Sequence, residues 1–157
     1  MTDRPDSELE FEFDNEELTQ PVRHAARVLV VEDDGELRAM IGARLRRQGF
    51  AVFEVGSGDD ALTLLAGMVE RHWPSDDVDL IVMDVRMPGA SGLEVAQILR
   101  VADWATPVLL MTAYPDAEVL DEAARLGVAV LGKPFGLDAL SSAAIAALAA
   151  PTIPAAR

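Results

Sequence analysis

The chain has 157 residues, of which half are hydrophobic, and its 27 acidic and 13 basic side chains give a net charge of −14. This size and composition suit one domain with a core of its own, and no apolar run is long enough to predict a transmembrane helix. The lack of cysteine excludes disulfides and thiolate zinc sites, and the first residues do not have the pattern of a secretory signal. We therefore expect a cytoplasmic protein without membrane contacts, and the absence of a basic stripe argues against direct nucleic-acid binding.

Both ends of the chain read as tails. Acidic residues dominate residues 1–26, which are predicted to be a disordered leader. An alternative remains open for residues 8–14, because the alternation of acidic and apolar residues in ELEFEFD is typical of a strand that adds to a sheet edge. The domain itself is predicted to span residues 27–150, and Pro151 opens a short C-terminal tail at 151–157.

Between these tails, short apolar runs alternate with segments of helical periodicity. In the first such segment, four larger apolar side chains are predicted to share one face: Leu37, Met40, Ile41 and Leu45. Cap residues mark helix ends, with Ser57 or Gly58, Ser91 and Asp116 at starts and Gly49 and Gly127 at ends. In chain order the predicted elements are a strand at 27–31, a helix at 35–48, a strand at 51–55, a helix at 59–70, a strand at 79–85, a helix at 91–100, a strand at 106–112, a helix at 115–127, a strand at 128–132 and a helix at 136–150.

This alternation predicts an α/β fold. The strands are continuous apolar runs, as in strands that are covered on both faces. Five strands separated by five helices predict a doubly wound five-stranded parallel sheet with helices on both faces. The last helix is rich in alanine, with Leu140, Ile145 and Leu148 as its larger apolar side chains. We expect it to be a plain helix against the sheet, with a shallow docking or dimer surface as the alternative.

Polar residues that can carry chemistry follow the predicted strands. They are Glu32, Asp33 and Asp34 after the first strand, Asp84 in the third, Thr112 at the end of the fourth, and Lys133 after the fifth. In open α/β sheets ligands bind beyond the carboxyl ends of the strands, so these side chains are expected to converge. Lys133 is the only lysine in the chain.

Such a group suits phosphoryl transfer to a carboxylate. Clustered carboxylates repel one another and are relieved by a cation, and carboxylate oxygens are the ligands that Mg²⁺ prefers. A carboxylate can also be the nucleophile that forms an aspartyl phosphate. Each residue taken singly has a plainer interpretation, because polar side chains are common in loops and Asp34 or Asp33 could simply cap a helix.

Other phosphate-binding classes fit the pattern less well. A flavodoxin-like phosphate cradle needs Gly, Ser and Thr after the first strand, where this chain has acids. The chain lacks the G-x-x-x-x-G-K-[ST] pattern of a P-loop. A hydrolase of the haloacid-dehalogenase type would have a second Asp two residues after the nucleophile, and Arg86 stands there.

Four segments resemble, in order, the signatures of bacterial two-component receiver domains: VLVVEDDGELR, IVMDVRMPGASGLEV, PVLLMTA and GKPF. The resemblance covers about residues 27–149. It implies the flavodoxin-like receiver fold with strand order 2-1-3-4-5. It also implies a stand-alone phosphorylation switch that catalyses only its own phosphorylation and dephosphorylation.

The resemblance implies a role for each site residue. Asp84 is the expected phosphoacceptor. Mg²⁺ is expected on Asp33, Asp84 and the backbone carbonyl of Arg86, with Glu32 acting through water. Thr112, the amide of Ala113 and Lys133 are expected to bind the phosphoryl group, with a cis peptide bond before Pro134. Arg86 and Tyr114 occupy the positions that tune dephosphorylation in the family.

The resemblance also implies partners. The phosphodonor is expected to be a histidine kinase or a histidine phosphotransfer protein, and the output a downstream protein target. The surface expected to change comprises the last two helices and the strand between them, and it is a candidate for a weak homodimer. One position departs from the family pattern, because Val130 replaces the aromatic residue usual three positions before the lysine. The alternative is a receiver-shaped interaction module that phosphorylation does not regulate.

Overall fold

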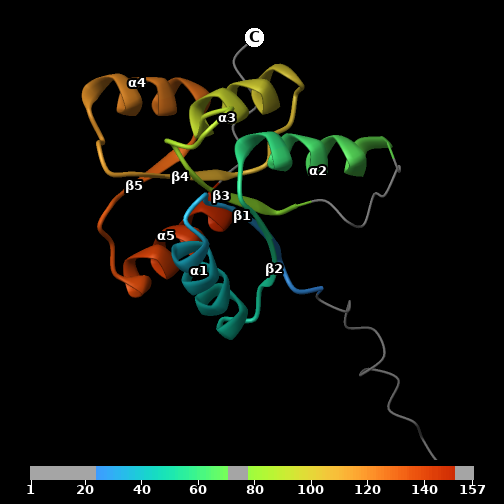
Figure 1. The fold of residues 1–157 in the computed structure, drawn as a ribbon, viewed down its shortest axis with the longest axis vertical. Coiled ribbons are helices and arrows are strands. Elements are labelled where there is room, and N and C mark those ends of the chain that lie inside the picture. The colour runs from blue at the N-terminus through green and yellow to red at the C-terminus, as the bar shows by residue number, and fades with distance from the viewer. Residues whose placement is uncertain (1–23, 71–77, 151–157) are drawn as a thin grey trace, which may run out of the picture.

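The computed structural model describes residues 24–70 and 78–150, so most of the predicted tails lie outside the described residues. Five strands and five helices alternate along this part of the chain, as Figure 1 shows. They are β1 (Arg27–Val31), α1 (Gly35–Arg47), β2 (Ala51–Val55), α2 (Gly58–Glu70), β3 (Leu80–Asp84), α3 (Gly92–Val101), β4 (Val108–Thr112), α4 (Ala117–Leu126), β5 (Ala129–Gly132) and α5 (Leu137–Ala149). The predicted type of each element is confirmed, with boundaries that differ by no more than a few residues.

The strands form one parallel sheet in the order β2-β1-β3-β4-β5. The chain therefore winds outward in both directions from β1, which confirms the doubly wound fold and the strand order implied by the resemblance. Helices α1 and α5 cover one face of the sheet, and α2, α3 and α4 cover the other (Figure 1). No helix in the described part of the chain is both long and apolar enough to span a membrane.

Two apolar clusters hold these layers together, one on each face of the sheet. All residues of β3 and β4 are buried, and so are four of the five residues of β1. The edge strands differ from the expectation that strands are covered on both faces, because β2 and β5 are only partly buried. An edge strand has a neighbouring strand on one side only, so the helices cover it less completely.

Helix α1 corrects one prediction. Ile41 and Leu45 are fully buried and Leu37 is partly buried against the same cluster, but Met40 is 53% exposed. Consecutive side chains on a helix point about 100° apart, so the stripe centred on Ile41 and Leu45 excludes Met40. Helix α5 packs as a plain helix, with Leu140 and Ala144 fully buried and Ile145 facing outward.

Helix caps position the loops that follow the strands. Ser91 and Asp116 each accept a backbone N–H hydrogen bond at the start of a helix, as the sequence predicts. Asp34, for which a cap was the plainer interpretation, accepts two. Gly127 ends α4 in the left-handed conformation, with φ of 66°. Gly92 at the start of α3 packs so closely that an added Cβ would lie 2.3 Å from the carbonyl oxygen of Asp84. The absence of a side chain at Gly92 therefore lets α3 pack directly against the end of β3.

Arg100 on α3 joins three parts of the fold. Its guanidinium donates hydrogen bonds to the carbonyl oxygens of Leu126, Trp104 and Thr106 at 3.0, 2.6 and 3.0 Å. Burial lowers the pKa of Arg100. These bonds fasten the C-terminal end of α4 and the segment before β4 to α3.

We therefore expect Arg100→Met to lower the free energy of unfolding by about 3 kcal/mol, because three carbonyl groups lose a charged donor. Urea denaturation measures this change. The matched control is Arg125→Met on α4, whose side chain is 71% exposed and pairs only with Glu122, and which should change stability by less than about 1 kcal/mol. Equal losses for the two variants would contradict the role given to Arg100.

Candidate functional site

The candidate site lies where β1, β3, β4 and β5 end at the same edge of the sheet. Glu32 and Asp33 follow β1, Asp84 is the last residue of β3, Thr112 is the last residue of β4, and Lys133 follows β5. Because the strands are parallel, their carboxyl ends meet at one edge. The structure thus places these five residues, which the sequence singled out, at one edge of the sheet.

Three carboxylates form the centre of the site. Carboxylate oxygens of Glu32, Asp33 and Asp84 all lie within 4.8 Å of one another, and this is the only such group among the described residues. Glu32 is 1% exposed and Asp84 is 7% exposed, whereas Asp33 is open to solvent. At 4.8 Å two carboxylates repel by about 3 kcal/mol for an effective dielectric of about 20. The cluster therefore has the charge and the oxygen donors to hold a cation.

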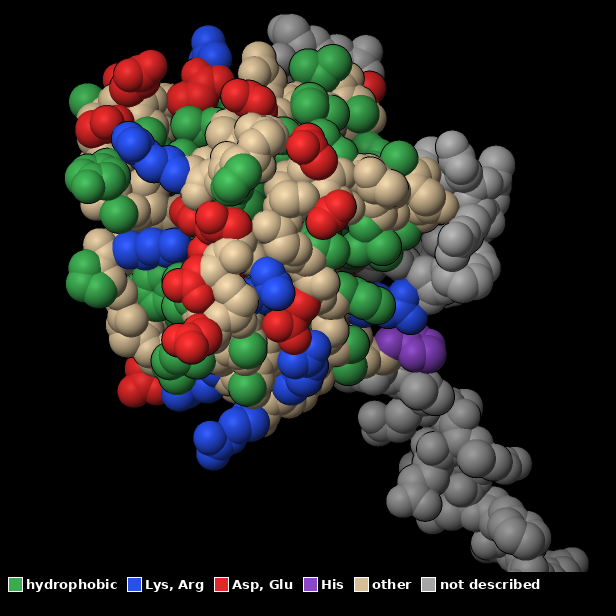
Figure 2. Space-filling view, viewed as in Figure 1, with side chains coloured by type: hydrophobic (Ala, Val, Ile, Leu, Met, Phe, Trp, Pro, Cys, Tyr) green, Lys and Arg blue, Asp and Glu red, His purple; other side chains and the backbone are tan. Residues whose placement is uncertain are grey.

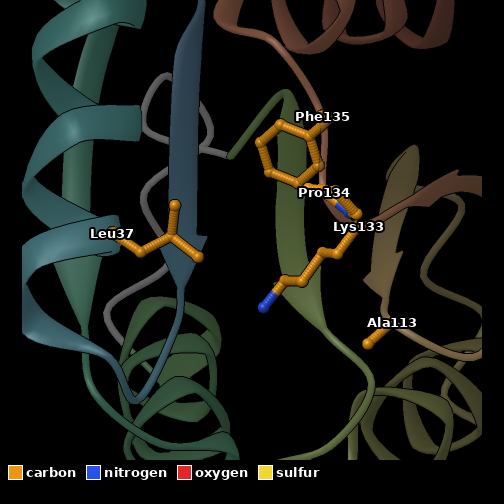
Figure 3. A pocket seen from close by; sticks show the side chains of 5 residues that line it. All are labelled: Leu37, Ala113, Lys133, Pro134 and Phe135. Atoms are coloured by element: carbon orange, nitrogen blue, oxygen red, sulfur yellow. The ribbon is translucent and has the colours of Figure 1, made fainter.

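Lys133 supplies one positive charge to this cluster. Its Nζ atom lies 3.0 Å from Glu32 Oε2 and 3.3 Å from Asp84 Oδ2. Figure 3 shows its side chain extending from the end of β5 across β3 towards β1. The backbone N–H of Lys133 donates to the carbonyl oxygen of Thr112 at 2.7 Å. The Lys133–Pro134 peptide bond is cis, as expected from the resemblance.

The site changes the pKa of two of its groups. Burial raises the pKa of Glu32, although the hydrogen bond from Lys133 opposes this change. Burial alone would lower the pKa of Lys133, but the hydrogen bond to Glu32 and the charge of Asp84 outweigh it, so the pKa of Lys133 is raised. The ammonium therefore remains charged, and one positive charge faces three acidic groups.

The loops that follow β3 and β4 begin with the same kind of contact, from a backbone N–H to the side-chain oxygen two residues earlier. The N–H of Arg86 points to Asp84 Oδ1 at 3.4 Å, and the N–H of Tyr114 donates to Thr112 Oγ1 at 3.1 Å. The Thr112 side chain is fully buried, whereas Ala113 is exposed. The guanidinium of Arg86 lies over the ring of Tyr114, 4.8 Å from its centroid.

Asp34 and Arg38 fix the loop between β1 and α1. Asp34 caps α1 through hydrogen bonds from the N–H groups of Glu36 and Leu37, and it is not part of the carboxylate cluster. Its plainer interpretation is therefore confirmed. Arg38, which sequence reasoning missed, donates to the carbonyl oxygen of Glu32 at 2.8 Å. The signal for it was available, because a side chain in the first turn of a helix leans back towards the N-terminal loop.

An apolar pocket adjoins the Lys133 amine. It has a volume of about 310 Å³, and Figure 3 shows the residues that line it: Leu37, Ala113, Lys133, Pro134 and Phe135. Val130, at the position where the family usually has an aromatic residue, is partly buried on β5 and packs against the cluster below α2, α3 and α4.

Most of the arginines on α1 are already paired with other groups of the protein. Figure 2 shows Lys and Arg side chains around α1 and Asp and Glu side chains over α4. Three of the four arginines are already bound, Arg38 to a carbonyl oxygen, Arg44 to Asp138 and Arg46 to Glu54. Helix α1 thus presents no row of unpaired cations of the kind that binds nucleic acid.

Comparison with known proteins identifies the family. The family model of the response regulator receiver domain matches residues 28–145. The chain belongs to this family. The receiver domain is 28% identical over 118 residues to sporulation initiation phosphotransferase F of Bacillus subtilis, a match that covers 74% of this chain and 89% of that protein.

Longer relatives contain the same domain. The receiver domain is 35% identical over 116 residues to the regulatory protein AtoC of Escherichia coli, which is 73% of this chain but only 23% of AtoC. Among solved structures, the chemotaxis response regulator CheY4 of Vibrio cholerae is similar, with a TM-score of 0.68 and 27% identity over 79% of this chain and 99% of CheY4. Receiver domains of this family generally bind Mg²⁺ at an acidic pocket, and the described residues of this chain include one cluster of three acidic side chains.

Proposed function

We propose that this receiver domain is a phosphoacceptor switch in which Asp84 takes a phosphoryl group from a histidine kinase or a histidine phosphotransfer protein. One observation carries the proposal: three carboxylates from two strand ends lie within 4.8 Å of one another, and the single lysine of the chain, from a third strand end, pairs with two of them. A cluster of this kind is unfavourable for folding alone, because its charges repel. Its chemistry is that of a site for a divalent cation and a phosphoryl group.

The donor set fits Mg²⁺. Asp33 and Asp84 supply carboxylate oxygens, the backbone carbonyl of Arg86 is the third proposed ligand, and Glu32 would act through a water molecule. When bound, Mg²⁺ would offset the repulsion between these carboxylates and the incoming phosphoryl oxygens. Asp33 is the exposed member of the cluster, so it is the most accessible to an entering ion.

Asp84 is placed to be the nucleophile. An oxygen of its carboxylate would form the new bond to phosphorus while the phosphorus–nitrogen bond to the donor imidazole breaks, and the imidazole nitrogen would keep the electron pair. The product carries close to two negative charges and three acceptor oxygens. Lys133, the Thr112 hydroxyl and the Ala113 N–H are the proposed donors to these oxygens. The Thr112 oxygen already accepts a hydrogen bond from Tyr114, so its own proton is free to be donated.

The surroundings of the site support a protein donor and a protein target. The apolar pocket of Leu37, Pro134 and Phe135 lies beside Lys133 and offers contact area next to the chemistry. The output is proposed to be a downstream protein that binds α4, β5 and α5, and the same surface is the proposed site of a weak homodimer. The domain limits of 27–150, the cytoplasmic location and the absence of activity on other substrates stay predictions.

The test is phosphorylation by acetyl phosphate with Mg²⁺, measured by intact-protein mass spectrometry. We expect one phosphoryl group per chain, located by peptide mapping in the segment that contains Asp84, and no phosphorylation when EDTA removes the metal. The alternative of an unregulated interaction module predicts no phosphorylation in either condition. A phosphoryl group on another residue, or one gained in EDTA, would contradict the proposed site.

A further inference from the structure

A contact between two side chains bridges the loops that leave β3 and β4. The guanidinium of Arg86 lies 4.8 Å from the centroid of the Tyr114 ring, which is the geometry of a cation–π interaction. Arg86 comes from the loop after Asp84, and Tyr114 comes from the loop after Thr112. The strands that carry these loops are neighbours in the sheet, with Asp84 beside Met111.

Backbone hydrogen bonds fasten both residues to the site. The Arg86 N–H lies 3.4 Å from Asp84 Oδ1, and the Tyr114 N–H donates to Thr112 Oγ1 at 3.1 Å. The two residues are therefore held next to the proposed phosphoacceptor and the proposed phosphoryl-binding hydroxyl. Arg86 takes part in none of the salt bridges among the described residues, so its charge is balanced by no carboxylate.

We propose that Arg86 senses phosphorylation by exchanging one partner of its guanidinium for another. In the unphosphorylated protein its guanidinium stacks on Tyr114. When Asp84 carries a phosphoryl group, the guanidinium leaves the ring and pairs with the phosphoryl oxygens. This inference rests on the proposed function, because it requires a phosphoryl group on Asp84.

The relative strengths of the two contacts give the exchange its direction. Tyr114 is 61% exposed, and a cation–π contact in such a place is weak because water screens it. Hydrogen bonds between a guanidinium and phosphoryl oxygens are charge-assisted, and the planar guanidinium can make two of them at once. A doubly charged group on Asp84 is therefore a better partner for Arg86 than the tyrosine ring.

The release of the Tyr114 ring would affect the start of helix α4. The carbonyl oxygen of Tyr114 accepts a hydrogen bond from the N–H of Asp116 at 2.8 Å, and Asp116 is the N-cap of α4. Arg100 holds the other end of α4 through the carbonyl oxygen of Leu126. A displacement of Tyr114 thus acts on the N-terminal turn of a helix whose C-terminal end is fixed.

The single tyrosine of the chain makes this exchange measurable. Protein labelled with 3-fluorotyrosine gives one ¹⁹F resonance, which reports the surroundings of Tyr114. We expect this resonance to move when acetyl phosphate and Mg²⁺ phosphorylate the protein. Mass spectrometry of the same sample gives the phosphorylated fraction, so a failure of phosphorylation is distinguished from a failure of the exchange.

Variants of Arg86 separate the exchange from other effects of phosphorylation. Arg86→Met keeps an unbranched side chain but removes the charge. In this variant the Tyr114 resonance of the unphosphorylated protein should lie at a different chemical shift, and most of the change on phosphorylation should be lost. Arg86→Lys should keep part of the shift, because it keeps the charge without the planar group. Arg47→Met, an exposed change of the same charge on α1, should behave as the unaltered protein.

Each outcome decides between the two claims. A phosphorylated protein whose resonance does not move, or an Arg86→Met variant that shifts as far as the unaltered protein, would overturn the exchange and leave the phosphoacceptor role intact. A protein that takes up no phosphoryl group at all would overturn the proposed function itself.

Discussion

Asp84→Asn is expected to abolish phosphorylation by acetyl phosphate and Mg²⁺, because an amide cannot form the acyl phosphate that the carboxylate forms. The substitution also removes one of three mutually repelling charges that lie within 4.8 Å of one another. Lys133 loses its 3.3 Å contact with Asp84 but keeps its 3.0 Å contact with Glu32. We therefore expect the free energy of unfolding in the absence of metal to rise by about 1 kcal/mol. Mass spectrometry and urea denaturation measure the two effects.

Asp34→Asn is the matched control for this experiment. It makes the same chemical change two residues from Glu32, but Asp34 is a helix cap and lies outside the carboxylate cluster. Asn caps a helix about as well as Asp, so stability should hardly change. The control should be phosphorylated as fully as the unaltered protein. Phosphorylation of the Asp84→Asn variant, or loss of phosphorylation in the control, would refute the choice of Asp84.

Lys133→Met is expected to lower the free energy of unfolding by about 3 kcal/mol near pH 8. It leaves Glu32, which is 1% exposed, without its cation, and the loss of one partner of a buried pair costs about 3–5 kcal/mol. The lower end applies because Glu32 can take up a proton. Mg²⁺ should restore part of the loss, since it supplies positive charge to the same carboxylates.

The loss of stability in Lys133→Met should be larger at high pH than at low pH. The Lys133 hydrogen bond holds the Glu32 pKa down against burial, so without it the pKa rises further above the ordinary value of 4.5. For a carboxyl group whose pKa is raised in the folded state, stability falls as the pH rises from the ordinary pKa to the raised one, and below the ordinary value there is no loss. The difference between the variant and the unaltered protein should thus be much smaller near about pH 5 than near about pH 8.

The control for the lysine is Arg47→Met, an exposed change of the same charge on α1. Its effect should remain below about 1 kcal/mol at both pH values. Urea denaturation of both variants gives the comparison. A Lys133→Met loss that is the same at both pH values would show that Glu32 is not the group left without a partner.

The sequence by itself determined the elements, their order and the residues at the strand ends. Apolar runs such as residues 27–31 and 51–55 became strands with the predicted bounds, and caps such as Ser91 and Gly127 lie where they were expected. These signals are local, because burial pattern and cap chemistry act within a few residues along the chain. Met40 is the exception, because the centre of a buried helical stripe is set by the sheet beneath it.

Only the tertiary structure decided which side chains meet. It pairs Lys133 more closely with Glu32 than with Asp84, across 101 positions in the chain. It also places Arg86 on Tyr114 and Arg100 on the end of α4. No local pattern encodes these partners, because each contact depends on the distance between segments that the packing of helices against the sheet brings together. The sequence therefore determines which groups stand at each strand end, and the packed fold determines which of them share a hydrogen bond.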